Sequence, residues 1–143
     1  MEQKQTQMKE QVITAGAVTD AMIMDIFDTA MGYARGRYIK RTEVVGEPHF
    51  PSMNGLATGM DLLVHLTESI TEGGPTSLRL TRQMLAEAIV KRLNHLNTTQ
   101  SERVGASDPA PEPMTLEDYL HLADEFEASN ALETALFGEQ VFA

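Results

Sequence analysis

Residues 52–71, SMNGLATGMDLLVHLTESIT, carry the pattern on which the prediction of the fold rests. Apolar side chains recur here at helical intervals, at Leu56, Met60, Leu63, Leu66 and Ile70. A serine is a favoured residue at a helix start, because its hydroxyl accepts a hydrogen bond from a free backbone N–H, and Ser52 stands at this start. The stretch therefore predicts a helix that ends near residue 71.

The flanking segments extend the helical pattern in both directions. Gly73, Gly74 and Pro75 predict a reversal of the chain, because glycine closes a helix and proline suits the start of the next. A further helix is expected from residue 76 or 77 to about 96, antiparallel to the helix before it. Another is expected over 19–36. Residues 42–51 lack a helical period and predict a loop, with a short strand at Val44 and Val45 as the open alternative. The expected fold class is all-α: a small helical bundle of about three body helices plus a tethered acidic C-terminal helix.

Charge divides the chain into two unlike parts. Residues 1–103 hold all 11 Lys and Arg together with 12 of the 21 acids, and residues 104–143 hold the other 9 acids and no Lys or Arg. Three prolines at alternate positions, Pro109, Pro111 and Pro113, favour extended backbone at this boundary. The predicted organisation is a polar arm over 1–18, a helical body over 19–103, a Pro-rich linker over 104–114 and an acidic amphipathic helix over 115–143.

The acidic C-terminal helix is a candidate protein-contact element. Thr115 and Asp118 fit a capping box. The stripe that would make the contact consists of Leu116, Tyr119, Leu120 and Phe126. Such a helix on a Pro-rich tether can dock on its own body, on a second subunit or on another protein. The alternative is that it is a fourth core helix behind a long linker.

Six basic residues form the candidate anion-binding set, in two segments: Arg35, Arg37, Lys40 and Arg41, and then Arg79 and Arg82. Guanidinium groups match phosphate and carboxylate, and a helix start after a glycine turn offers free N–H groups. Both segments also have a structural interpretation. Basic side chains at a helix C-terminus complement the helix dipole, and 72–79 can be an ordinary capped turn.

Catalytic and metal-binding patterns are weak. Asp61, His65 and Glu68 would lie on one helix face, but a single face supplies too few ligands, so no metal site and no cofactor are expected. His49 could act as a general base, yet no recognisable signature accompanies it. No catalytic residue is assigned, and an enzyme using His49, or Asp61 with His65, ranks third among the functional hypotheses.

Composition sets the functional classes. No apolar run is long enough to span a bilayer and the chain starts with a polar segment, so we expect no membrane contact and a cytoplasmic location. A net charge of −10 argues against direct nucleic-acid binding. The leading hypothesis is a non-enzymatic binding or assembly protein, homo-oligomeric and acting through protein contacts. The alternative is a binder of a small anion such as a nucleotide or phosphate, held by the arginines near 35–41 and 79–82.

The combination of small size, acidity and absence of cysteine resembles assembly factors such as phage tail chaperones, and inhibitors that imitate nucleic-acid charge. This resemblance concerns composition and size, and it implies no residue roles.

Overall fold

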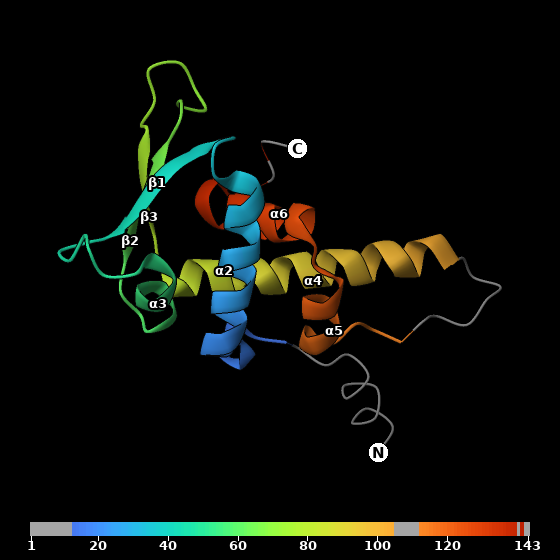
Figure 1. The fold of residues 1–143 in the computed structure, drawn as a ribbon. Coiled ribbons are helices and arrows are strands. Elements are labelled where there is room, and N and C mark those ends of the chain that lie inside the picture. The colour runs from blue at the N-terminus through green and yellow to red at the C-terminus, as the bar shows by residue number, and fades with distance from the viewer. Residues whose placement is uncertain (1–12, 105–111, 140, 142–143) are drawn as a thin grey trace.

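The computed structural model describes residues 13–104, 112–139 and 141. Its elements, in chain order, are the 3₁₀ turn η1 (Ala15–Ala17), α2 (Asp20–Ala34), β1 (Ile39–Val44), α3 (Ser52–Ala57), β2 (Leu62–Leu66), β3 (Ser77–Leu80), α4 (Arg82–Val104), α5 (Leu116–Leu122) and α6 (Glu125–Phe137). Figure 1 shows the sheet at one end of the molecule and the long helix α4 running away from it.

The all-α helical bundle that the sequence predicted is wrong, because a three-stranded antiparallel sheet accompanies the helices. The expected helix over 52–71 ends at Ala57, and Leu62–Leu66 forms a strand. The start of the expected third helix is the strand Ser77–Leu80, so a β2–β3 hairpin replaces the helical hairpin. The physical reason is that Leu62, Val64 and Leu66 alternate along the chain and are all buried, which is the period of a strand.

A bulge in β1 turns its basic residues outward. The strand order is β1-β2-β3, and the register passes from Ile39 opposite Leu66 to Arg41 opposite His65, so Lys40 is an extra residue in β1. Side chains alternate between the faces of a strand, so two residues five apart would normally face opposite sides. The bulge lets both Ile39 and Val44 face the core while Lys40 stays exposed.

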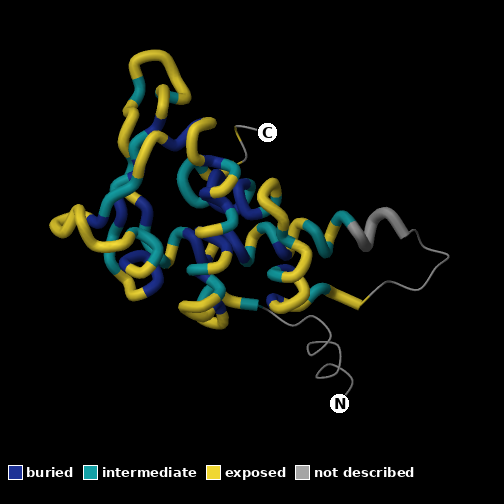
Figure 2. The backbone as a smooth tube through the Cα atoms, viewed as in Figure 1, coloured by how far each residue is buried: buried dark blue, intermediate teal, exposed yellow. Residues whose placement is uncertain are grey.

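The helices cover one face of the sheet and share a core with it. Helix α6 packs against both α2 and α4, and α3 packs against α2 and β1. Figure 2 shows the buried segments concentrated where the sheet meets these helices. The fully buried side chains include Ile23, Ile26, Leu62, Val64, Leu80, Leu85, Ile89, Leu93 and Leu132.

The acidic C-terminal segment forms two helices where one was expected. Its capping box is confirmed: the Thr115 hydroxyl accepts a hydrogen bond from the Asp118 N–H, and the Asp118 carboxylate accepts one from the Thr115 N–H. Helix α5 ends at Leu122, and the Asp124 side chain then caps α6 by accepting a hydrogen bond from the Glu127 N–H. Asp124 is therefore a second helix-start signal, and it divides the acidic segment into two helices.

A polar network lies between α6 and the rest of the core. The hydroxyls of Tyr38 and Ser129 are 2.8 Å apart, and Ser129 donates to the Glu133 carboxylate at 3.1 Å. The other oxygen of Glu133 accepts from the Val141 N–H at 2.6 Å. Burial raises the pKa of Tyr38 well above its ordinary value, so its hydroxyl keeps its proton. Each buried polar group here has a partner, as burial requires.

Parts of the predicted organisation lie outside the described residues: the arm over 1–18 up to residue 12, and the linker over 104–114 from 105 to 111. The boundaries of the arm, body, linker and C-terminal segment stay predictions. None of the helices in the described ranges combines the length and apolar character needed to cross a membrane.

Candidate anion-binding cleft

Three of the six predicted anion-binding residues line one open cleft between α2, β1 and the start of α3. Arg35 follows the last residue of α2, and Lys40 and Arg41 lie on β1. The cleft has a volume of about 620 Å³. Pockets for small ligands commonly measure about 300–1,000 Å³, so the cleft has room for more than a single anion.

The local backbone explains why these three cations meet. Gly36 has a φ of +85°, a left-handed conformation that glycine adopts without strain, and the chain turns there from α2 into β1. The Gly36 N–H donates to the Ile39 carbonyl at 3.0 Å, which closes the turn. Arg35 before the turn and Lys40 at the bulge after it are thereby brought to the same side of the molecule.

Two of the three cations are uncommitted. Arg41 donates to the Glu43 carboxylate at 3.1 Å, and its side chain is 57% exposed. Within the part of the chain that the structure describes, Arg35 and Lys40 form no ion pair. An incoming anion would therefore meet two exposed charges that need not first leave a protein partner.

The cleft also carries neutral polar groups, an acid and an apolar floor. Thr42 donates to the Ser52 hydroxyl at 2.9 Å, which joins β1 to the start of α3 at the cleft wall. Asn54 lines the same side. The remaining lining residues include the exposed Asp28 and the apolar Phe27, Met31 and Met53. The arrangement can hold an anionic group at its basic end and accept hydrogen bonds from hydroxyls at Asp28.

Arg37 belongs to the end of α2 and does not line the cleft. Its guanidinium donates to the Tyr33 carbonyl at 2.8 Å and lies 4.0 Å from the centroid of the Tyr33 ring. A carbonyl in the last turn of a helix lacks an intrahelical partner, and a cation there complements the helix dipole. The structural interpretation of basic residues at a helix end therefore fits Arg37.

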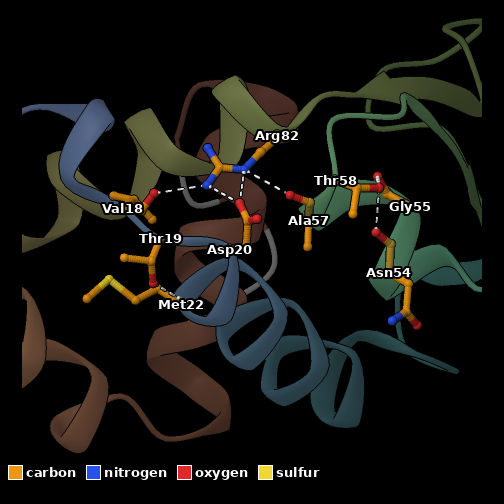
Figure 3. Close-up of polar contacts among 9 residues, drawn as sticks. All are labelled: Val18, Thr19, Asp20, Met22, Asn54, Gly55, Ala57, Thr58 and Arg82. Atoms are coloured by element: carbon orange, nitrogen blue, oxygen red, sulfur yellow. Dashed lines mark hydrogen bonds and ion pairs between the residues drawn. The ribbon is translucent and has the colours of Figure 1, made fainter.

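Arg79 and Arg82 do not line the cleft, and each of them pairs with a different acid. Arg79 pairs with Asp61 at 2.5 Å on the sheet. Arg82, at the start of α4, donates to the Asp20 carboxylate at 2.7 Å and to the carbonyls of Val18 at 3.0 Å and Ala57 at 3.1 Å. Figure 3 shows this guanidinium reaching both the start of α2 and the end of α3. Arg82 therefore fastens three segments of the chain together.

The predicted protein-contact residues divide between core and surface. Leu116 and Tyr119 are buried within the chain itself, and Leu120 is half-buried against the core. Phe126 is 57% exposed, and its ring centroid lies 4.8 Å from that of Tyr33.

The expected helix face of Asp61, His65 and Glu68 does not form, because His65 lies in β2. Its Nε2 contacts the Glu43 carboxylate at 2.7 Å, and its Nδ1 lies 2.9 Å from the Ser77 hydroxyl. The hydrogen bond from His65, with help from Arg41, holds the pKa of Glu43 below its usual range. Among the described residues, no three His, Asp or Glu side chains gather as a metal site would need. His49 lies exposed in the loop between β1 and α3.

Sequence reasoning missed the neutral residues of the cleft and its acid. Asp28 could have been found, since it lies seven residues before Arg35 and so shares a face of the same helix. Thr42, Ser52 and Asn54 had no such signal, because their approach to Arg35 depends on how α3 folds back beside β1.

Comparisons with protein-family models, with curated proteins and with solved structures each give no match to this chain.

Proposed function

We propose that this protein is a binding protein whose cleft holds the anionic group of a small ligand, such as a phosphate ester. One observation carries the proposal: Arg35, Lys40 and Arg41 come from two elements and line one cleft. Charge-assisted hydrogen bonds to phosphate or carboxylate are stronger than neutral ones, and exposed guanidinium groups are well shaped for them. This arrangement favours the sequence-based alternative, a binder of a small anion. Three of the six residues predicted for that function line the cleft.

The size and lining of the cleft favour a ligand larger than phosphate itself. Thr42, Ser52 and Asn54 offer neutral hydrogen-bonding groups, and the oxygens of Asp28 offer acceptors. A sugar phosphate or nucleotide carries both the anionic group and the hydroxyls that such a lining suits.

Thermal unfolding with inorganic phosphate, AMP and ATP at millimolar concentration tests the proposal. A ligand present at ten times its Kd stabilises the native state by about 1.4 kcal/mol, which raises the Tm of a chain of this size by roughly 3–6 °C. We expect such a shift with at least one of the phosphate esters.

Arg41 and Arg79 provide a matched pair of variants. Both are on the sheet, both pair with one acid, and their side chains are 57% and 58% exposed, but only Arg41 lines the cleft. Arg41→Gln should weaken binding about tenfold, whereas Arg79→Gln should leave it unchanged. The proposal would be refuted if none of these ligands raised the Tm of the unmodified protein, or if both variants lost the same amount of binding.

A second candidate function, self-association, is favoured by a different surface. Leu122 at the end of α5 and Phe126 in α6 are 53% and 57% exposed, and Phe126 contacts Tyr33 of α2. We propose that a second copy of the chain covers this surface. Light scattering should then show an oligomer that becomes a monomer in the double variant Leu122→Ala with Phe126→Ala. A monomeric unmodified protein at high concentration would exclude it.

A further inference from the structure

The outer face of the sheet carries a serine, a histidine and a glutamate on three neighbouring strands. Glu43 lies on β1, His65 on β2 and Ser77 on β3. His65 and Ser77 are register partners, so their side chains stand on the same face. The two contacts of the imidazole ring are 2.9 Å from Nδ1 to the Ser77 Oγ and 2.7 Å from Nε2 to the Glu43 Oε1.

The Glu43 carboxylate determines which atoms donate and which accept in the hydrogen-bonded series of Ser77, His65 and Glu43. An ionised carboxylate can only accept, and hydrogen bonds from His65 and Arg41 hold the pKa of Glu43 low, so Nε2 of His65 is the donor to Glu43. In the neutral ring Nδ1 is then the acceptor. When the ring is neutral, the Ser77 hydroxyl donates to Nδ1, which is the arrangement of a nucleophile beside a general base that a third group orients.

Accessibility is graded along the three residues. The side chains of His65 and Glu43 are 17% and 24% exposed, whereas Ser77 is exposed. The base and its orienting acid are thus sheltered while the hydroxyl faces outward. This gradient suits a reaction with an external molecule, since only the nucleophile needs to reach it.

We propose that Ser77 is a nucleophilic serine that takes the acyl group of an activated ester, with His65 as general base and Glu43 as the residue that positions the ring. Ser77 Oγ forms a bond to the ester carbonyl carbon and passes its proton to Nδ1 of His65. The ester C–O bond breaks, and the leaving alkoxide takes that proton from His65. Water then splits the acyl-serine by the same proton route and releases the acid.

The surroundings indicate the substrate class. Ser77 directly follows the loop that joins β2 to β3 and lies at an open edge of the sheet, so the site suits small acyl groups on good leaving groups. Arg79 lies two residues along β3 and therefore on the same face, and Arg41 is the register partner of His65. Arg41 and Arg79 also pair with Glu43 and Asp61, and their positive charge beside the site favours the negative charge that develops on the carbonyl oxygen.

This site shares Arg41 with the proposed anion-binding cleft, but neither Ser77 nor His65 lines that cleft. The two proposals can therefore fail separately. Variants at Ser77 and His65 test the serine without touching the basic residues, and Arg41 is left unchanged throughout.

The test uses the full chain with a fluorophosphonate probe, whose P–F bond is replaced by a P–O bond to a reactive serine, and locates the adduct by peptide mass spectrometry. We expect labelling at Ser77, with at least a tenfold lower rate in His65→Gln and none at that peptide in Ser77→Ala. Ser69→Ala is the matched control, because the Ser69 hydroxyl donates to a backbone carbonyl, that of Thr71, and not to a histidine. It should label like the unmodified protein.

Release of p-nitrophenolate from p-nitrophenyl acetate provides the second measurement, with the same ranking of variants expected. Failure of the unmodified protein to label at Ser77, or labelling that His65→Gln leaves unchanged, would overturn the proposal. Circular dichroism of each variant separates a loss of reactivity from a loss of fold.

Discussion

Arg92 of α4 and Glu127 of α6 form an ion pair with two hydrogen bonds, 2.7 Å from Nε to Oε2 and 2.8 Å from Nη2 to Oε1. The Tyr119 hydroxyl of α5 donates to the same Oε2 at 2.7 Å. One carboxylate thus joins three helices. Burial raises the pKa of Tyr119, and the hydrogen bond to Glu127 raises that of Arg92, so both donors keep their protons. The acidic C-terminal segment is held on its own body by this cluster as well as by apolar packing.

Removal of this ion pair should be costly. The side chains of Arg92 and Glu127 are only 17% and 13% exposed, so Arg92→Ala leaves a shielded charge without its partner. We expect a loss of about 2–3 kcal/mol in the free energy of unfolding, measured by urea denaturation. Arg79→Ala is the control, since an exposed pair contributes about 1 kcal/mol or less. Similar small losses in both variants would mean that the cluster does not fasten the segment.

Arg82 should behave as a structural residue and not as a ligand contact. Arg82→Ala removes hydrogen bonds to Asp20 and to the carbonyls of Val18 and Ala57. The expected loss is about 2–3 kcal/mol of unfolding free energy, because at least one bond is to a charged partner. Calorimetric titration with AMP should give the same Kd for folded Arg82→Lys as for the unmodified chain. A large change in Kd without a change in stability would return Arg82 to the anion site.

Gly73 should resist substitution in the β2–β3 loop. Its φ is +75°, and a side chain in this left-handed region costs about 1–2 kcal/mol. Gly73→Ala should lower the free energy of unfolding by that amount. Gly74 has no left-handed φ, but an added Cβ would meet the Thr71 hydroxyl, which can rotate away, and would lie 3.1 Å from the Thr71 backbone carbonyl oxygen, which cannot. Gly74→Ala should therefore also be destabilising, and a negligible cost at both positions would contradict the loop conformation.

The pair of Glu43 with His65 and Arg41 should appear in the pH dependence of stability. The pKa of Glu43 is lower in the folded protein than the ordinary glutamate value of about 4.3, so the unfolded chain binds this proton more tightly. The stabilisation is present above that ordinary value and is lost as the pH falls through the folded pKa. The difference in Tm between the unmodified protein and Glu43→Gln should shrink below about pH 4. A difference in Tm that stays constant from pH 7 to pH 3 would contradict a lowered pKa of Glu43 in the folded protein.

The start of α2 and the start of α5 were predictable because their signals are local, whereas the division of the C-terminal segment into α5 and α6 was missed. The expected helix over 19–36 corresponds to α2, and the capping box at Thr115 stands where the sequence placed it. The sheet was missed because residues 56–70 fit two periods. Leu66 belongs both to a helical stripe with Leu63 and to an alternating strand with Val64. Pairing with β1 and β3 selects the strand, and that pairing is a non-local event.

The candidate cleft was half predictable for a similar reason. Arg35, Lys40 and Arg41 lie close together in the sequence, so the sequence alone identified them as one candidate segment. Arg79 and Arg82 looked alike, but their acids, Asp61 and Asp20, are 18 and 62 residues away in the chain. No local pattern could indicate that these two arginines are already paired. The same holds for Ser77 and His65, which only the β2–β3 register places side by side.

The proposed function depends above all on the binding of an anionic ligand in the cleft beside Arg35, Lys40 and Arg41. The most direct measurement is a titration of the ¹⁵N-labelled protein with inorganic phosphate and AMP, followed by amide chemical shifts. Saturable shifts are expected at residues 35, 40–42 and 52–54, with the amides of 79–82 unchanged. Shifts centred on 79–82, or none at the cleft at millimolar ligand, would contradict the proposed function.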